Sequence, residues 1–267
     1  RNDRVMDGII ERLSTGKRIN SAADDPAGLA IATRLTSQVN GLNQAARNAN
    51  NAISMVQIAD NAADTLDNIF QRMREIVVQA ADGSNSASDI ALLNTEFTAL
   101  AEETDRLVDT TSYNGRNIID GNADESGGSS VTYQVGSNAG IEQTLTIDFG
   151  DLNLGNGGLG GDFSSWKTTG LGSNLNTTLT DIDTAISAVA TQRATYGASL
   201  NRLEYAVDNL HSASLTTSIA RGRIEDTNYA AETARLAKQQ ILEQVGTALL
   251  AQANVEAKSV LKLLDAN

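Results

Sequence analysis

The chain has 267 residues, a net charge of −13 and no cysteine. The lack of cysteine excludes disulfides, thiolate metal sites and thiol catalysis, and the acidic balance argues against a nucleic-acid surface, which needs clustered Lys and Arg. Since 40% of the residues are hydrophobic but only 4% are aromatic, the chain can bury a core of closely approaching, Ala-rich helices. We therefore expect a folded, mainly α and elongated protein.

Residues 1–14 predict an amphipathic helix whose apolar stripe includes Val5, Ile9 and Leu13. Ser14-Thr15-Gly16 is a typical helix end, and a polar joint extends from there to residue 25. Pro26, the only proline, suits the first position of a second helix, and Asp25 is its expected N-cap.

The second helix is expected over residues 27–81, a length of ~80 Å at 1.5 Å per residue. Its apolar positions alternate steps of four and three, with one additional step of three between Val56 and Ala59. That spacing is a coiled-coil seam with one phase slip. The seam is Leu35, Val39, Leu42, Ala46, Ala49, Ile53, Val56, Ala59, Ala63, Leu66, Phe70, Met73, Val77 and Ala80.

A third helix over 88–110, capped by Ser88, is expected to fold back antiparallel to the second because the connection is short. Between 113 and 173 the periodicity changes to alternation. Residues 130–135 and 143–149, separated by Gly136-Ser137-Asn138-Ala139-Gly140, predict a β-hairpin. Trp166 is interpreted as a local packing anchor.

Helical periodicity resumes at Thr178 and is expected to be interrupted at 221–226. A final amphipathic helix then covers about 228–264. Its apolar stripe consists of Leu236, Ile241, Val245, Leu249, Val260 and Leu264. Both chain ends thus carry a terminal helix joined to a long helix by a short polar segment, and the predicted fold is an antiparallel helical bundle formed by both ends.

The sequence contains no pattern that indicates catalysis. His211 is the only histidine, so a zinc site lacks further ligands, and no phosphate-binding or hydrolase motif is present. No apolar run of about 18 residues occurs, so no segment is expected to enter a membrane. We expect no cofactor, no metal and no enzymatic activity.

A long signature, ERLSTGKRINSAADDPAGLAI, covers residues 11–31. It resembles the N-terminal region of bacterial flagellin, and the similarity continues through 47–54, 71–75 and 113–115. It resumes at 202–203 and around 218–230, and closes at 240–242 and 250–254. The resemblance covers most of the chain.

This resemblance implies a subunit of the flagellar filament. The terminal helices, 1–25 and 222–267, would form an inner domain; the long helices, 26–112 and 174–221, a core domain; and 113–173 a hairpin and outward-facing loop region. Because family members carry larger central insertions and a longer N-terminal helix, the chain resembles a minimal flagellin with a trimmed N-terminus.

The resemblance also implies partners and a location. The partners are further copies of the chain, an export chaperone, and cap and junction proteins. The location is the extracellular filament, reached through the flagellar type III apparatus without a cleaved signal peptide. In flagellins sensed by the innate Toll-like receptor, positions matching Arg72, Ile76 and Glu96 bind the receptor, with Leu in place of Ile76. In the alternative interpretation, Arg72, Arg74 and Glu75 are ordinary solvated or subunit-contact residues.

The apolar stripes of the terminal helices independently predict assembly. One chain cannot cover both stripes, and a repeated heterologous contact between identical chains produces an open helical array. Three alternatives stay open: a monomeric coiled coil in which the two ends pair, a hook-filament junction protein, and a cell-surface homologue that binds polysaccharide through residues 120–175.

Overall fold

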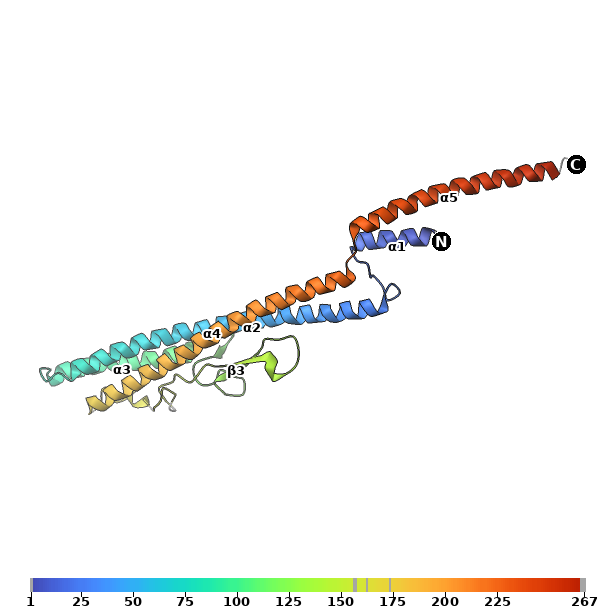
Figure 1. The fold of residues 1–267 in the computed structure, drawn as a ribbon. Helices are drawn as coiled ribbons and strands as arrows, with labels where there is room; N and C mark the ends of the chain where they lie inside the picture. Colours follow the sequence, from blue (N-terminus) through green and yellow to red (C-terminus); the bar gives the residue numbers. More distant parts are fainter. Residues whose placement is uncertain (1, 156–157, 162, 173, 265–267) are drawn as a thin grey trace. The chain divides into compact units, whose positions relative to one another are not determined.

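The computed structural model describes residues 2–155, 158–161, 163–172 and 174–264, with side chains for these except 2, 3 and 256–264. Most of the described chain is helical, which confirms the predicted fold class (Figure 1). The helices are α1 (Asn2–Thr15), α2 (Pro26–Ala80), α3 (Ala87–Thr110), α4 (Leu175–Glu225) and α5 (Tyr229–Leu264). The strands are β1 (Ser112–Tyr113), β2 (Arg116–Asn117), β3 (Ser130–Gln134) and β4 (Thr144–Asp148).

The chain divides into two compact units. One contains residues 1–40 and 214–267, and the other contains residues 41–213. Each unit combines segments from both halves of the sequence. The three-part division predicted above refers to layers of an assembled filament, and it stays a prediction.

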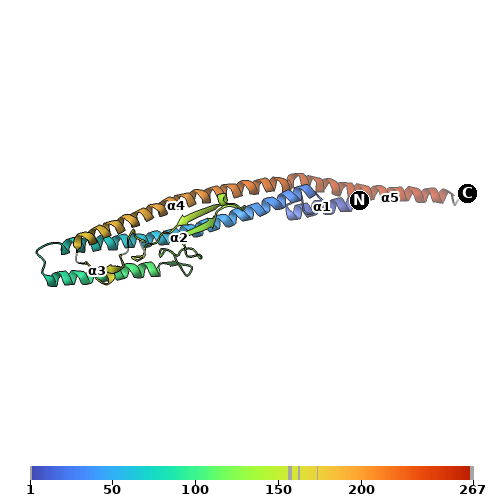
Figure 2. The same ribbon diagram turned by 90° about the horizontal axis from the view of Figure 1, so that it is seen from below.

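In the unit formed by 41–213, α2 and α4 are antiparallel. Arg74 of α2 pairs with Asp183 of α4 (2.7 Å), and Arg193 of α4 pairs with Asp60 of α2 (3.2 Å), so residue numbers fall along one helix as they rise along the other. Helix α3 folds back along α2 (Figure 2), as the short connection predicts.

The predicted seam of α2 is buried over most of its length, but the buried face is wider than the seam. Ala45, Ala52, Met55, Ala62 and Ile76 lie between seam positions and are buried as well. A helix packed on one partner buries a narrow stripe, and a helix covered from several sides buries a broad one. Helix α2 is of the second kind, since one continuous core unites it with α3, α4 and the β region.

The middle of the chain contributes to this core rather than standing apart from it. Trp166 is 3% exposed and lies edge-on to Phe70 of α2 and Phe97 of α3, at ring-centroid distances of 6.3 and 5.9 Å. The buried Tyr196 hydroxyl of α4 donates to the Phe149 carbonyl just after β4 (2.5 Å). The interpretation of Trp166 as a packing anchor is therefore confirmed.

The predicted β-hairpin is confirmed, with β3 and β4 antiparallel and Thr132 opposite Thr146. A second, shorter hairpin between β1 and β2 was not predicted. Its two turn residues, Asn114 and Gly115, both have positive φ, 53° and 78°. An Asn-Gly pair is the preferred sequence for such a turn, because both positions must adopt the left-handed region. The Asn114-Gly115 dipeptide is therefore the sequence feature that could have predicted the β1–β2 hairpin.

One sequence prediction about the start of a helix needs correction, and another is confirmed. The N-cap of α3 is Ser86 and not Ser88: the Ser86 hydroxyl accepts from the Asp89 N–H, and Asp89 accepts from the Ser86 N–H (2.9 Å), forming a capping box. The Asp25 cap of α2 is confirmed, since its carboxylate accepts from the Gly28 N–H (2.9 Å).

The predicted interruption at 221–226 is placed too early: α4 continues through Gly222 to Glu225, and the break before α5 covers only residues 226–228. The Asp226 N–H still donates to the Gly222 carbonyl in helical fashion (2.8 Å), and Arg221 faces Glu225 one turn later (3.9 Å). A glycine inside a helix costs only about 1 kcal/mol relative to alanine. The local preference is therefore too weak to end a helix held by its neighbours.

Candidate assembly surface

Helices α1 and α5 lie side by side in the unit formed by residues 1–40 and 214–267 (Figures 1 and 2). Ile9 is buried and Leu13 of α1 and Leu236 of α5 are half-buried. These three positions of the predicted stripes are therefore covered, wholly or in part, within the chain.

The polar joints that precede α2 and α5 are bonded to each other. The Arg18 N–H donates to the Glu225 carbonyl (2.6 Å), and the Thr227 N–H donates to the Gly16 carbonyl (2.9 Å). Lys17 adds an ion pair to the Glu225 carboxylate (2.5 Å). Gly16 has φ of 72°, a left-handed conformation that ends α1 and turns the chain toward this contact.

A charged cluster holds the start of α5 against α1. Glu232 is buried and faces Arg12 (3.5 Å) and Arg235 (3.1 Å). Arg12 also approaches Asp24 of the first joint (3.8 Å). A buried carboxylate needs such partners, since an unpaired buried charge is strongly destabilising. Together with the joint contacts, the cluster fixes which face of α5 stays open.

The open face of α5 is strongly apolar. Ile241, Val245 and Leu249, spaced by four residues, are 60%, 48% and 65% exposed. Leu242, Leu250 and Val255 are exposed as well, and on α1 so are Val5 and Ile10. We call Ile241, Val245 and Leu249 the α5 stripe. The predicted members Val260 and Leu264 lie outside the residues whose side chains are described. Exposed apolar surface of this kind marks an interaction site.

Asp24 shapes the first joint, and its protonation state is expected to matter. Its carboxylate accepts from the N–H groups of Ser21 (2.9 Å) and Asn20 (3.1 Å). Backbone hydrogen bonds, first from Ser21 and then from Asn20, lower the pKa of Asp24. A carboxylate that is hydrogen-bonded in the folded state stabilises that state only while it is ionised.

We therefore expect Asp24→Asn to lower the melting temperature at neutral pH. The pKa of Asp24 is lower in the folded state than in the unfolded state. The stabilisation that the Asp24 carboxylate provides is therefore complete above the unfolded-state pKa, and it disappears as the pH falls through the folded-state pKa. The melting temperatures of parent and variant, followed by circular dichroism, should converge in strong acid. Asp7→Asn, at an exposed residue of α1, is the control and should leave the melting temperature near that of the parent; a gap independent of pH for Asp24→Asn would contradict the assignment.

The structure brings together two of the three predicted receptor-binding residues. Arg72 of α2 and Glu96 of α3 form an exposed ion pair (2.7 Å), and Arg72 also reaches Glu75 (3.0 Å). The hydrogen bond to Glu96 raises the pKa of Arg72, so the guanidinium is always charged. Ile76 does not share this surface, because it is completely buried in the core.

The described residues offer no metal site. They contain no group of three or more His, Cys, Asp and Glu residues arranged for a metal ion, and His211 is exposed. Within the same residues, no helix combines the length and the apolar content that a bilayer crossing requires. The notable feature of the surface is the open apolar face of a terminal helix.

A helical fold with such an open apolar face is typical of proteins that bind other proteins through it. The sequence profile of the bacterial flagellin N-terminal helical region matches residues 1–124, and that of the C-terminal helical region matches residues 179–264. The chain belongs to the bacterial flagellin family. It is thus a structural protein and not an enzyme.

Individual relatives are similar in sequence to this chain along nearly its whole length. The flagellin of Halalkalibacterium halodurans is 39% identical over 255 residues, which cover 96% of this chain and 90% of that protein. The flagellar filament 33 kDa core protein of Treponema phagedenis is 38% identical, covering 96% and 91%. A structure of a putative flagellar hook-associated protein from Vibrio parahaemolyticus shares the fold, with a TM-score of 0.60, 17% identity, and 76% and 100% of the two chains covered.

Proposed function

We propose that this protein is the self-assembling subunit of an extracellular flagellar filament that serves swimming motility. The observation that carries the proposal is the α5 stripe, which stays exposed although α1 already lies against α5. At ~25 cal/mol per Å² of buried apolar surface, covering this face with a second copy is the favourable outcome. The relative named as a filament core protein supports the same reading.

The proposal includes a mode of assembly. We propose that a neighbouring copy covers the α5 stripe with a different surface and not with its own α5 stripe. Repetition of such a heterologous contact gives an open helical polymer instead of a closed dimer. In this proposal α1 and α5 contribute to the inner layer of the filament, and 113–173 lies farther out.

Purified protein at rising concentration, with and without fragments of preformed filament as seeds, tests the proposal. Sedimentation and electron microscopy should show seeded elongation above a critical concentration. A protein that stays monomeric at every concentration, even with seeds, would contradict it. Capping of seed ends without further growth would instead favour a junction protein. Export by the type III apparatus and binding to a chaperone and to cap and junction proteins belong to the same proposal.

A second function rests on the Arg72–Glu96 pair. We propose that the monomer is a ligand of the innate Toll-like receptor for flagellin and that this exposed ion pair, in which two Arg72 nitrogens contact one Glu96 oxygen, forms part of the contact. Since Ile76 is fully buried, we assign it the role of holding α2 in place and not of touching the receptor.

Receptor signalling by monomeric Arg72→Ala beside the parent protein tests this second function. We expect a loss of potency of at least tenfold, because truncating an arginine at the centre of a contact costs about 2 kcal/mol or more. Arg106→Ala is the matched control, since it removes another exposed arginine of an ion pair on α3. Equal potency of the parent and Arg72→Ala would contradict the proposed receptor contact.

A further inference from the structure

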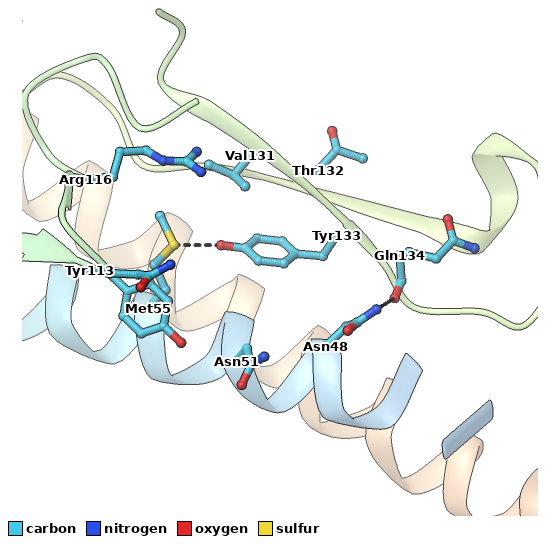
Figure 3. Close-up of a pocket in the computed structure, with 10 residues that line it drawn as sticks. Asn48, Asn51, Met55, Tyr113, Arg116, Val131, Thr132, Tyr133 and Gln134 are labelled. Carbon is cyan, nitrogen blue, oxygen red and sulfur yellow. Dashed lines mark hydrogen bonds between the residues drawn. The ribbon is translucent and has the colours of Figure 1, made fainter. Parts of the chain in front are cut away.

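A hollow of about 680 Å³ opens on the unit formed by 41–213, between α2 and the β region (Figure 3). Asn48, Asn51 and Met55 line it from α2, Tyr113 and Arg116 from the short hairpin, and Tyr133 from β3. Both polar and apolar side chains line the hollow. The Tyr133 hydroxyl donates to the Met55 sulfur (2.8 Å). Burial raises the pKa of Tyr133 to about 12, so this ring stays neutral.

The hollow contains one guanidinium, that of Arg116. Arg116 donates to the Ala123 carbonyl (2.9 Å) and forms no ion pair with any described residue. None of the described residues that line the hollow has a carboxylate, although the chain has 33 acidic and 20 basic residues. The two tyrosine rings and Met55, beside a guanidinium without an ion-pair partner among the described residues, suit an apolar group followed by a carboxylate.

The tip of the β3–β4 hairpin presents such a pair. Ile141 is 90% exposed, the highest value among the exposed large apolar side chains described. Glu142 is exposed and has no ion-pair partner among the described residues. The tip has internal support: the Gln143 N–H donates to the Gly140 carbonyl (3.0 Å), and the Thr144 hydroxyl donates to the Ile141 carbonyl (2.8 Å). An ordered tip loses little entropy when it docks.

We propose that the hairpin tip of one copy seats in this hollow on a neighbouring copy, with Ile141 against the Tyr113 and Tyr133 rings and Glu142 paired with Arg116. The high exposure of Ile141 excludes insertion of the tip into its own hollow. Because tip and hollow are different surfaces of the same chain, the contact is heterologous and repeats along a polymer. The inference rests on the proposed filament and adds a second contact, independent of the α5 stripe.

Cysteine cross-linking tests the contact, since the chain has no cysteine of its own. Ile141→Cys and Asn51→Cys proteins are mixed in equal amounts, elongated from seeds and treated with a short bis-maleimide reagent. Covalent dimers are expected in filaments and not in unassembled mixtures. Leu92→Cys, on an exposed apolar residue of α3, replaces Ile141→Cys in the control. Filaments that form but yield no more dimer than this control overturn the contact, whereas parent protein that never elongates overturns the filament.

A charge exchange supplies a second readout that does not depend on cysteine variants. Glu142→Arg should raise the critical concentration for elongation about tenfold. Adding Arg116→Glu should lower the critical concentration again, most of the way to the parent value. The melting temperature of monomeric Glu142→Arg should match that of the parent, since Glu142 has no described ion-pair partner. Unchanged elongation by Glu142→Arg, or no rescue in a folded double variant, would overturn the pairing of Arg116 with Glu142.

Discussion

The double variant Val245→Asp and Leu249→Asp is expected to abolish filament elongation at concentrations at which the parent protein polymerises. Both side chains lie on the open face of α5 and are largely exposed in the single chain. In a filament they would be buried, and burying an unpaired carboxylate costs several kcal/mol. A loss of about 3 kcal/mol per contact raises the critical concentration roughly 100-fold.

The measurement is sedimentation of seeded samples, with electron microscopy of the pellet. The control double variant, Thr247→Asp and Asn254→Asp, adds the same charge on the opposite side of α5, where both residues are exposed. It should elongate near the parent's critical concentration. Normal elongation by the Val245 and Leu249 variant would show that the α5 stripe is not an assembly surface. Circular dichroism of the monomers establishes that both variants keep their helices.

Trp166→Ala is expected to lower the free energy of unfolding by about 3–5 kcal/mol, the usual cost of truncating a large buried aromatic side chain. The indole stacks on Phe163 (4.6 Å between ring centroids) and meets Phe70 and Phe97 edge-on. Its removal would leave a cavity between α2, α3 and the middle segment, because side chains from three separate parts of the chain converge there.

Denaturant unfolding followed by far-UV circular dichroism measures this effect, since Trp166 is the only tryptophan and fluorescence would be lost with it. Trp166→Phe, which keeps an aromatic ring in the site, should cost less. Leu92→Ala, at a side chain that is 72% exposed, should change the free energy by less than about 0.5 kcal/mol. A small effect of Trp166→Ala would mean that the middle segment contributes little to the stability of the core.

Periodicity in the sequence was sufficient to place the helices. The apolar spacing of α2 predicted residues 27–81 against the observed Pro26–Ala80, and alternation predicted the β3–β4 hairpin. Local chemistry was less decisive at the ends. Ser86 and Ser88 are both suitable caps, and only Ser86 lies three residues before Asp89, the acid that completes the box.

The candidate assembly surface was partly visible in the sequence. Repeats of four in α5 identified Ile241, Val245 and Leu249, but the same spacing in α1 identified Ile9, which is buried inside the chain. Periodicity shows that a helix has an apolar face and does not show which partner covers it. Ile76 shows the same limit. The resemblance to receptor-binding flagellins grouped Ile76 with Arg72, but in the structure Ile76 is buried in the core.

By itself, the sequence determined the helices, the polar joints and the resemblance to flagellins, because these depend on residues close together along the chain. Only the tertiary structure decided which apolar positions stay exposed, how the two joints bond to each other, and that Tyr113, Arg116 and Tyr133 share a hollow with α2. Those outcomes depend on contacts between residues far apart in sequence. The periodicity of one segment contains no information about where another segment packs.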